Sequence, residues 1–237
     1  MEQKCWKLAP SDFAFLWEDC KRCFYLKVVH GFRRPSSPMP KIFTRIDMQM
    51  KLCFGGRRTE DVLPGLPGGL LEFSEKWVTS IPLVIPGRAS GCFVRGKFDT
   101  VIRFDDGTFG VVDFKTCDRN DHHIPLYARQ LHAYAFALEL AAAGSLCLKP
   151  VSRLGLLVFE PTAFSKDGNG SCYLGGGLKW IEIPRTDGAF KQFLAEVLDL
   201  LESTTVPSPN PDCGWCHYQG ASRQPNFRSQ RDDTLCA

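Results

Sequence analysis

The stretch GKFDTVIRFDDGTFGVVDFKT, residues 96–116, decides the fold class. Its two halves are rich in β-branched and aromatic residues, which favour strands, and the Asp-Asp-Gly at residues 105–107 between them is typical of a tight turn. The pattern predicts an antiparallel pair of strands, with Asp99 in the first strand and Asp113 and Lys115 in the second.

The second strand carries an acid and a base at alternating positions. Because strand side chains alternate, Asp113 and Lys115 share one face and Phe114 faces the opposite, buried one. Val111 and Val112 lead directly into Asp113, so we expect this carboxylate to emerge from a buried run. An uncompensated carboxylate is costly there, and a cation would offset the cost.

A divalent cation suits this pair of strands. Asp99, Asp113 and the carbonyl of Phe114 form an oxygen-rich set for Mg²⁺ or Mn²⁺, with positions left for water and a substrate phosphate. Lys115 could then orient or deprotonate the attacking water and stabilise charge on the phosphorane. The alternative is an ordinary salt bridge on an exposed hairpin, which a D-x-K tripeptide standing alone would favour.

Helices and further strands surround the central pair. Periodicity predicts helices over residues 11–26, 41–54, 125–142 and 188–202, and strand patterns at 81–85, 92–104, 109–116, 153–160 and 178–184. The Gly/Ser-rich stretch 165–177 is expected to be a flexible loop, and residues 219–237 a polar, disordered tail. The order predicts a single α/β domain over residues 1–218, with a central mixed sheet flanked by helices.

Composition narrows the class of protein. The chain has 237 residues, of which 44% are hydrophobic and 23% charged, so coiled-coil, collagen-like and low-complexity proteins are excluded. The N-terminus lacks the apolar segment of a signal peptide, and no run approaches 18 apolar residues, so we expect a cytoplasmic protein that does not enter the membrane. Residues 1–58 hold twelve Lys or Arg against five acids, which could attract phosphates or could simply form a solvated surface.

Eleven cysteines are many for a reduced chain of this size, and four of them form pairs at metal-ligand spacing. The pairs are Cys20-x-x-Cys23 and Cys213-x-x-Cys216, which together make a four-thiolate set for Zn²⁺ or a [4Fe–4S] cluster. Such a site would join residues 1–30 to residues 205–218 and close the domain. The remaining cysteines are expected to be core or loop residues, with two weaker ligand candidates at the chain ends: Cys53, Cys92, Cys117, Cys147 and Cys172, then Cys5 and Cys236.

Three successive segments resemble one nuclease family. GKFDTVIRF, FGVVDFKT and YARQLHAY are similar to motifs II, III and IV of the PD-(D/E)XK superfamily in its RecB-like exonuclease branch. The matching positions are Gly96 and Asp99, Asp113 and Lys115, and Gln130 and Tyr134. The opening LAPSDFAFLWEDCKRCFYL also resembles the start of many members. The resemblance implies a restriction-endonuclease-like fold and a Mg²⁺- or Mn²⁺-dependent deoxyribonuclease, with Gln130 and Tyr134 positioning the DNA strand.

The sequence departs from the family at motif I, where many members carry a His or Glu as a further metal ligand. Asp47, in the helix KIFTRIDMQMKL, is the best positional candidate, and Glu60 is the second. Either acid could equally belong to the solvated face of its segment. A missing motif I ligand leaves open a second function, that of a catalytically inactive nucleic-acid-binding protein with a nuclease fold.

The resemblance also bears on the cysteine pairs. AddB-type repair nucleases and CRISPR-adaptation exonucleases are similar in binding an iron–sulfur cluster with cysteines from both ends of the nuclease domain. That likeness favours [4Fe–4S] over Zn²⁺, although the usual distribution is one and three cysteines and this chain has two and two. The partners implied are DNA, single-stranded or at duplex ends, and a protein of a repair or CRISPR defence complex.

Overall fold

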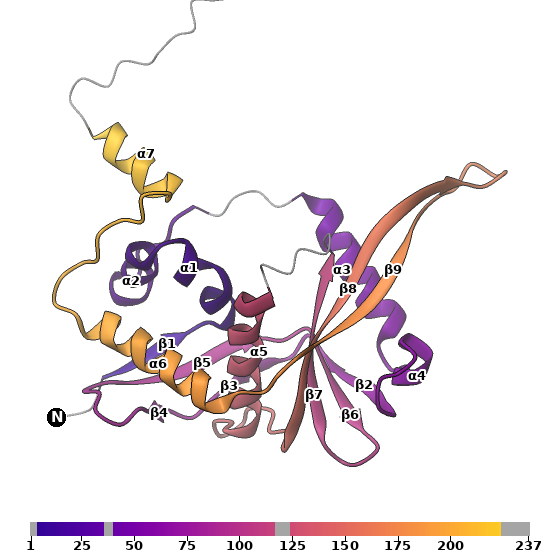
Figure 1. The fold of residues 1–237 in the computed structure, drawn as a ribbon, viewed down its shortest axis with the longest axis horizontal. Coiled ribbons are helices and arrows are strands. Elements are labelled where there is room, and N and C mark those ends of the chain that lie inside the picture. Colours follow the sequence, from indigo (N-terminus) through magenta and orange to yellow (C-terminus); the bar gives the residue numbers. More distant parts are fainter. Residues whose placement is uncertain (1–3, 36–39, 117–123, 224–237) are drawn as a thin grey trace, which may run out of the picture.

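The computed structural model describes residues 4–35, 40–116 and 124–223, which form two sheets and surrounding helices (Figure 1). The smaller sheet has the order β1-β5-β3, with β4 also paired to β5, and consists of β1 (Cys5–Leu8), β3 (Trp77–Thr79), β4 (Leu83–Val84) and β5 (Gly91–Lys97). The larger sheet has the order β2-β6-β7-β8-β9 and consists of β2 (Gly69–Ser74), β6 (Thr100–Phe104), β7 (Phe109–Thr116), β8 (Val151–Lys166) and β9 (Cys172–Ile183).

The predicted α/β class and mixed sheet are confirmed. Strand β6 pairs antiparallel with β7, from Thr100 opposite Val112 to Arg103 opposite Phe109, which is the hairpin expected from residues 96–116. Strand β7 pairs parallel with β8, so the larger sheet is mixed. The smaller sheet is mixed too, because β1 runs parallel to β5 and β3 antiparallel to it.

One predicted strand is wrong, because residues 92–104 form two strands in two sheets. The chain leaves β5 after Lys97 and enters β6 at Thr100. Phe98, which is fully buried, anchors this crossing in the core. Asp99 therefore lies at the point where the chain passes from one sheet to the other, and not within a strand.

The helices cover the sheets, and most lie where periodicity predicts. Their bounds are η1 (Asp12–Leu16, a π-helical turn), α1 (Trp17–Asp19), α2 (Lys21–His30), α3 (Lys41–Phe54), α4 (Thr59–Val62), α5 (Ile124–Glu139), α6 (Asp187–Glu202) and α7 (Gly214–Ser222). The single helix expected over residues 11–26 is interrupted at Cys20, whose backbone is extended (φ −164°, ψ 112°). This break makes Cys20 the N-cap of α2, immediately before the first turn, which carries Cys23.

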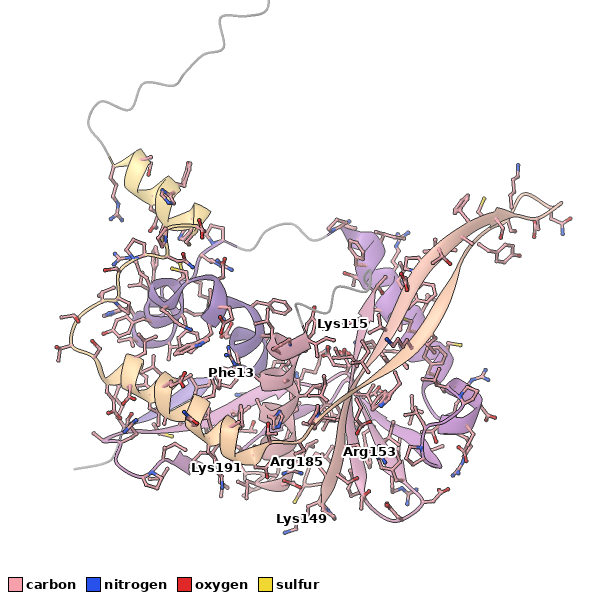
Figure 2. The ribbon with its side chains drawn as sticks, in the orientation of Figure 1. Phe13, Lys115, Lys149, Arg153, Arg185 and Lys191 are labelled. Carbon is pink, nitrogen blue, oxygen red and sulfur yellow. The ribbon has the colours of Figure 1, made fainter. Side chains whose placement is uncertain are left out.

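Two cores hold the layers together. In the larger core, α5 contributes seven buried hydrophobic residues, and Phe13 (labelled in Figure 2) packs edge-on against Phe190 and Phe193 of α6. A second core lies under α3 and α4, where side chains from β2, β6, β7 and β8 meet Met50 and Val62. Strand β7 therefore faces a hydrophobic core on both sides, and a charged side chain on it is buried unless it lies at the strand end.

The β8–β9 hairpin continues past the sheet as a long two-stranded arm (Figure 1). Most of the flexible loop expected over residues 165–177 is in fact paired strand, with Lys166 opposite Cys172. Gly176 of this segment has a packing role, because a Cβ there would lie 2.1 Å from the carbonyl oxygen of Glu160. The two strands approach closely there, because Gly176 pairs with Pro161 beside the β-bulge between Pro161 and Ala163.

The C-terminal part also differs from expectation. Helix α7 extends to Ser222, so residues 219–222 of the expected tail are helical, and residues 224–237 lie outside the described part. The domain bounds at residues 1–218 stay a prediction. Within the described residues, no helix is long and apolar enough to cross a membrane.

Gly96 gives a direct test of how the two sheets pack. A Cβ at this position would lie 2.8 Å from Cδ of Pro10 and 3.0 Å from Cε1 of Tyr134, and the Tyr134 hydroxyl is fixed by donating to the Lys97 carbonyl at 2.7 Å. We expect Gly96→Ala to destabilise the fold by about 1–3 kcal/mol through overpacking, measured by urea unfolding. Gly188→Ala in α6, where a Cβ meets nothing within 4 Å, should be neutral or stabilising by up to about 1 kcal/mol. Equal stabilities of both variants and the parent chain would contradict the close packing.

Candidate functional site

A pocket of about 720 Å³ opens beside the crossing between the two sheets. Its walls come from the N-terminal segment, α3, β3, β5, β7 and α5. It brings together most of the residues that the sequence singles out: Asp47, Asp99, Asp113, Lys115, Gln130 and Tyr134, with Phe114 also in the lining. Residues separated by up to 87 positions in the chain thus share one site, as the motif spacing predicts.

The backbone of β7 fixes the two central carboxylates relative to each other. Alternation along β7 places Phe114 in the second core, under α3, and Asp113 and Lys115 in the pocket. The Phe114 N–H donates to Oδ2 of Asp99 at 2.9 Å. This hydrogen bond holds the Asp99 side chain against β7 at Phe114, the residue between Asp113 and Lys115. The Asp99 carboxylate therefore faces the pocket that Asp113 and Lys115 line.

Asp113 is buried, with 5% of its surface exposed. Burial is the main reason that its pKa rises to about 6, and the nearby charge of Asp99 acts in the same direction, while Lys115 opposes the rise. Gln130 Nε2 donates to Asp113 Oδ1 at 3.1 Å. Oδ2 is in ion-pair contact with Lys115 but makes no hydrogen bond of acceptable geometry within the described structure. One oxygen of a buried carboxylate therefore keeps an unused lone pair.

Lys115 is held as a cation at the end of β7, beside α5 (Figure 2). Burial would lower its pKa, but Asp113, Tyr127 and Asp99 together outweigh burial and raise it. The ammonium also lies 4.7 Å from the centroid of the Tyr127 ring. A protonated lysine at this position is suited to stabilising negative charge.

A second cation, Lys51 of α3, lies among three carboxylates. Its Nζ is 2.8 Å from Asp47 Oδ2, 2.6 Å from Glu75 Oε1 and 2.8 Å from Asp99 Oδ1. Burial would lower the pKa of Lys51, but these hydrogen bonds outweigh it and raise the pKa. Sequence reasoning missed both Lys51 and Glu75. The spacing of four residues between Asp47 and Lys51 on one helix is a signal that could have found the lysine.

The two motif I candidates separate in space. Asp47 lines the pocket and is linked to Asp99 through the single ammonium of Lys51. Glu60 lies elsewhere, because its Oε1 accepts from Arg58 at 2.8 Å and Arg58 in turn pairs with Asp105. Asp105 follows the end of β6 opposite to Asp99, so the structure does not bring Glu60 to the pocket.

Gln130 and Tyr134 both lie on the pocket side of α5, and they contact different groups. Gln130 holds Asp113, whereas the Tyr134 hydroxyl donates to the Lys97 carbonyl and its ring packs edge-on against Phe98. Gln130 is 7% exposed and Tyr134 is 5% exposed. Their observed contacts therefore position a carboxylate and the crossing between the sheets.

The donor set fits a hard divalent cation. Carboxylate oxygens are the ligands that Mg²⁺ and Mn²⁺ prefer. Asp113 Oδ2 has no hydrogen bond, and Asp47 and Asp99 share the single ammonium of Lys51, so carboxylate oxygens of the pocket can still accept a cation. Asp99 and Asp113 could hold such a cation, with Asp47 as the nearest further acid on α3.

The four predicted cysteine ligands meet at one point. Their Sγ atoms all lie within 4.8 Å of one another, with separations of 3.6 Å for Cys23–Cys216 and 3.8 Å for both Cys20–Cys216 and Cys23–Cys213. Three of them are buried and Cys216 is half-buried. The prediction that a cysteine cluster joins the N-terminal and C-terminal regions is confirmed.

Hydrogen bonds around the cluster reinforce this junction. Arg22 donates to the Pro207 carbonyl at 3.1 Å, and the Tyr25 hydroxyl donates to the Ser203 carbonyl at 3.0 Å. The Asn210 side chain donates to the Asp19 carbonyl at 3.0 Å. Five described cysteines lie outside the cluster, and two further ones fall outside the described residues: Cys5, Cys53, Cys92, Cys147 and Cys172, then Cys117 and Cys236.

The cysteine thiols influence one another. Burial disfavours the Cys20 thiolate, but hydrogen bonds from the backbone of Asn210 and Cys23 outweigh burial and lower its pKa to about 7. Burial and the neighbouring Cys213 and Cys20 raise the pKa of Cys216 to about 11. Four thiolates at these separations repel one another, so a bound cation is needed for all four to ionise.

Comparison with known proteins addresses the family directly. A solved crystal structure, that of SSO0001, aligns with 97% of this chain and 89% of its own chain, at 17% sequence identity and a TM-score of 0.45. Comparison with curated proteins found no match. A family model described as the PD-(D/E)XK nuclease superfamily matches residues 57–221, a range that includes Asp99, Asp113 and Lys115. Because that match spans well over half of the sequence, the chain belongs to the PD-(D/E)XK nuclease superfamily.

Proposed function

We propose that this chain is a metal-dependent deoxyribonuclease of the RecB-like exonuclease branch. The observation that carries the proposal is the meeting of Asp99, Asp113 and Lys115 in one pocket, where a buried carboxylate oxygen lacks a hydrogen bond. Membership of the superfamily supports phosphodiester hydrolysis as the reaction. The motif spacing and the likeness of residues 8–26 to that branch support the finer assignment.

The side chains divide the work of hydrolysis. A divalent cation held by Asp99 and Asp113 would supply an activated water and neutralise charge on the phosphate. Gln130 orients Asp113 through its hydrogen bond, so one carboxylate oxygen stays directed at the pocket. Lys115, fixed as a cation, stabilises the negative charge that grows on the phosphate oxygens. Tyr134 keeps the crossing that carries Asp99 in place through the Lys97 carbonyl.

The mouth of the pocket suits a nucleic-acid strand. Three exposed aromatic side chains line it, Phe15, Phe43 and Trp77, with exposed fractions of 43%, 43% and 62%. Arg95 and Lys97 line the same pocket, and the Arg95 guanidinium lies 5.6 Å from the centroid of the Trp77 ring. Exposed rings beside cations are the usual contacts for unstacked bases and phosphates, which favours single-stranded DNA or frayed duplex ends as substrate.

The basic N-terminal quarter has a smaller role than its charge count suggests. Several of its cations are already paired with carboxylates, among them Lys27 with Asp12 and Arg34 with Asp19. The cations at the pocket mouth, Arg95 and Lys97, come from β5 instead, and of these Lys97 is itself paired with Glu75. We infer that local placement at the mouth, and not the regional charge excess, guides the substrate phosphates.

One observation favours the second candidate, a nuclease-fold protein that binds nucleic acid without cutting it. The Lys51 ammonium already neutralises Asp47, Glu75 and Asp99, and could keep a divalent cation out. The two functions differ in one outcome, which is cleavage of DNA in the presence of Mg²⁺ or Mn²⁺.

Cleavage of labelled oligonucleotides tests the proposal. We expect the chain to degrade single-stranded DNA with Mn²⁺, and Asp113→Asn and Lys115→Met each to reduce the rate by roughly 100-fold or more, because each removes charge that acts on the reacting phosphate. Both variants should still bind DNA in a filter assay. Glu60→Gln is the matched acid control and should keep full activity, since Glu60 lies away from the pocket. DNA binding by the unaltered chain without cleavage under any divalent cation would establish the second candidate.

The raised pKa of Asp113 predicts a pH dependence of stability in the metal-free protein. A carboxyl group whose pKa rises to about 6 on folding stabilises the fold below its unfolded pKa of about 4, and this contribution is lost as the pH rises through 6. In chelator, we expect the unfolding free energy of the parent chain to fall relative to that of Asp113→Asn by up to about 3 kcal/mol between pH 4 and pH 7. Parallel curves for the two proteins would show that Asp113 titrates normally.

Lys51 predicts a competition with divalent cations. Lys51→Met should leave Asp47 and Asp99 without their ion pair, whereas Glu75 keeps Lys97; we expect a lower melting temperature of the metal-free protein and Mn²⁺ binding tighter by about tenfold or more in calorimetry. Lys191→Met on α6 (Figure 2) removes an exposed lysine outside the pocket and should change neither value. Weaker Mn²⁺ binding in Lys51→Met would mean instead that the lysine positions the acids for the cation.

A further inference from the structure

The cysteine cluster has the dimensions of a site for one metal ion. A tetrahedral ion bound to four thiolates at about 2.3 Å places the sulfur atoms about 3.8 Å apart. Three of the separations here are 3.6, 3.8 and 3.8 Å, and no pair of the four sulfur atoms is more than 4.8 Å apart. The space at the centre of the four sulfur atoms therefore accommodates a single ion.

A four-iron cluster does not fit the same space. In a [4Fe–4S] cluster each cysteine binds a different iron, so the four iron ions lie inside the sulfur tetrahedron and hold the cysteine sulfur atoms roughly 6 Å apart. Every pair in this cluster is closer than that. The iron–sulfur cluster implied by the family resemblance would require α2 and α7 to move apart, and the hydrogen bond from Asn210 to the Asp19 carbonyl crosses the same junction.

The two cysteine pairs present their sulfur atoms in the same way. Cys20 and Cys213 each precede a helix with extended backbone, at α2 and α7. In each case the carbonyl of that first cysteine accepts the first helical hydrogen bond, from Phe24 N–H and from His217 N–H, both at 3.0 Å. Each pair is thus a half-site that offers two sulfur atoms from one helix start, and two such half-sites complete one tetrahedral shell.

We propose that Cys20, Cys23, Cys213 and Cys216 hold one zinc ion in place of an iron–sulfur cluster. Zinc is the ion most often bound in closed four-cysteine structural sites, and it undergoes no redox change. The ion would join the start of α2, at Lys21, to the start of α7, at Gly214. These two helices lie near opposite ends of the described residues. This inference goes beyond the nuclease proposal and does not depend on it, because it concerns metal content and geometry alone.

The proposed zinc has a structural consequence for the pocket. The N-terminal helices that it anchors continue from η1, and Ser11 and Phe15 of that segment line the pocket. Loss of the ion would free both ends of the chain and weaken this wall. A redox-inert ion makes the wall insensitive to oxidants and reductants, whereas an iron–sulfur cluster would couple it to both.

Metal analysis of the full chain, purified without oxygen from cells supplied with both iron and zinc, tests the proposal. We expect about one zinc per chain, no inorganic sulfide, a colourless protein, and a zinc X-ray absorption spectrum with four sulfur atoms at about 2.3 Å. Four irons with inorganic sulfide and a brown colour would overturn it, and so would a single iron or a folded chain that binds no metal. Each of these readings is independent of whether the protein cleaves DNA.

A ligand replacement separates zinc from a cluster by a second route. Cys216 is the half-buried member of the set, so Cys216→His can supply a nitrogen ligand in its place. Zinc accepts three cysteines and one histidine, so we expect this variant to keep one zinc and to unfold on chelation, as the parent chain does. Cys147→Ser, which alters an exposed cysteine outside the cluster, is the control and should match the parent chain in zinc content. Iron and inorganic sulfide retained by Cys216→His would contradict the proposal.

Discussion

Burial of the Asp113 carboxylate beside Asp99 is the constraint on which the pocket depends. Two acids in a poorly solvated site repel each other, and each loses hydration that only polar partners can replace. The structure supplies these partners from four directions: Gln130 of α5, Lys115 of β7, the Phe114 N–H and Lys51 of α3. One oxygen of Asp113 still has no hydrogen bond, so the protein alone leaves the cost of burial partly uncompensated. A divalent cation, as proposed for this pocket, would remove the remainder.

The position of Asp99 at the crossing between the sheets follows from the same constraint. A side chain within β5 or β6 would be directed by the pleat of its own sheet, whereas a residue in the short connection can turn toward β7. The buried side chain of Phe98 anchors this connection in the core. Gly96, which has no side chain, lets Pro10 and Tyr134 pack closely against the backbone just before the connection. The family spacing of a glycine three residues before the acid therefore has a packing reason. The glycine makes room for the elements that hold the acid in place.

The sequence predicted those parts of the site that depend on local periodicity. Alternation along residues 109–116 placed Asp113 and Lys115 together, and the spacing of cysteine pairs predicted a cluster joining both ends of the chain. It could not place Glu75, which reaches Lys51 only because β2 ends beside α3, a tertiary relation with no local signal. It also misjudged residues 165–177, because glycine is common both in flexible loops and where two strands approach closely. Choosing between Asp47 and Glu60 likewise required the position of α3 against the sheet.

The cysteine cluster and the pocket lie on two sides of the same N-terminal segment, so their stabilities are coupled. The segment packs into the larger core through Phe13 and Trp17, and its ends are fixed by β1 and by the cluster at Cys20 and Cys23. The smaller sheet has four short strands, and β4 contributes only two residues. Such a sheet gives limited support to the N-terminal segment that forms one wall of the pocket. A metal ion that closes the chain from Cys20 to Cys213 removes entropy from the unfolded chain over nearly its whole length. The site most distant in sequence from the carboxylates thus helps to keep the wall of their pocket in position.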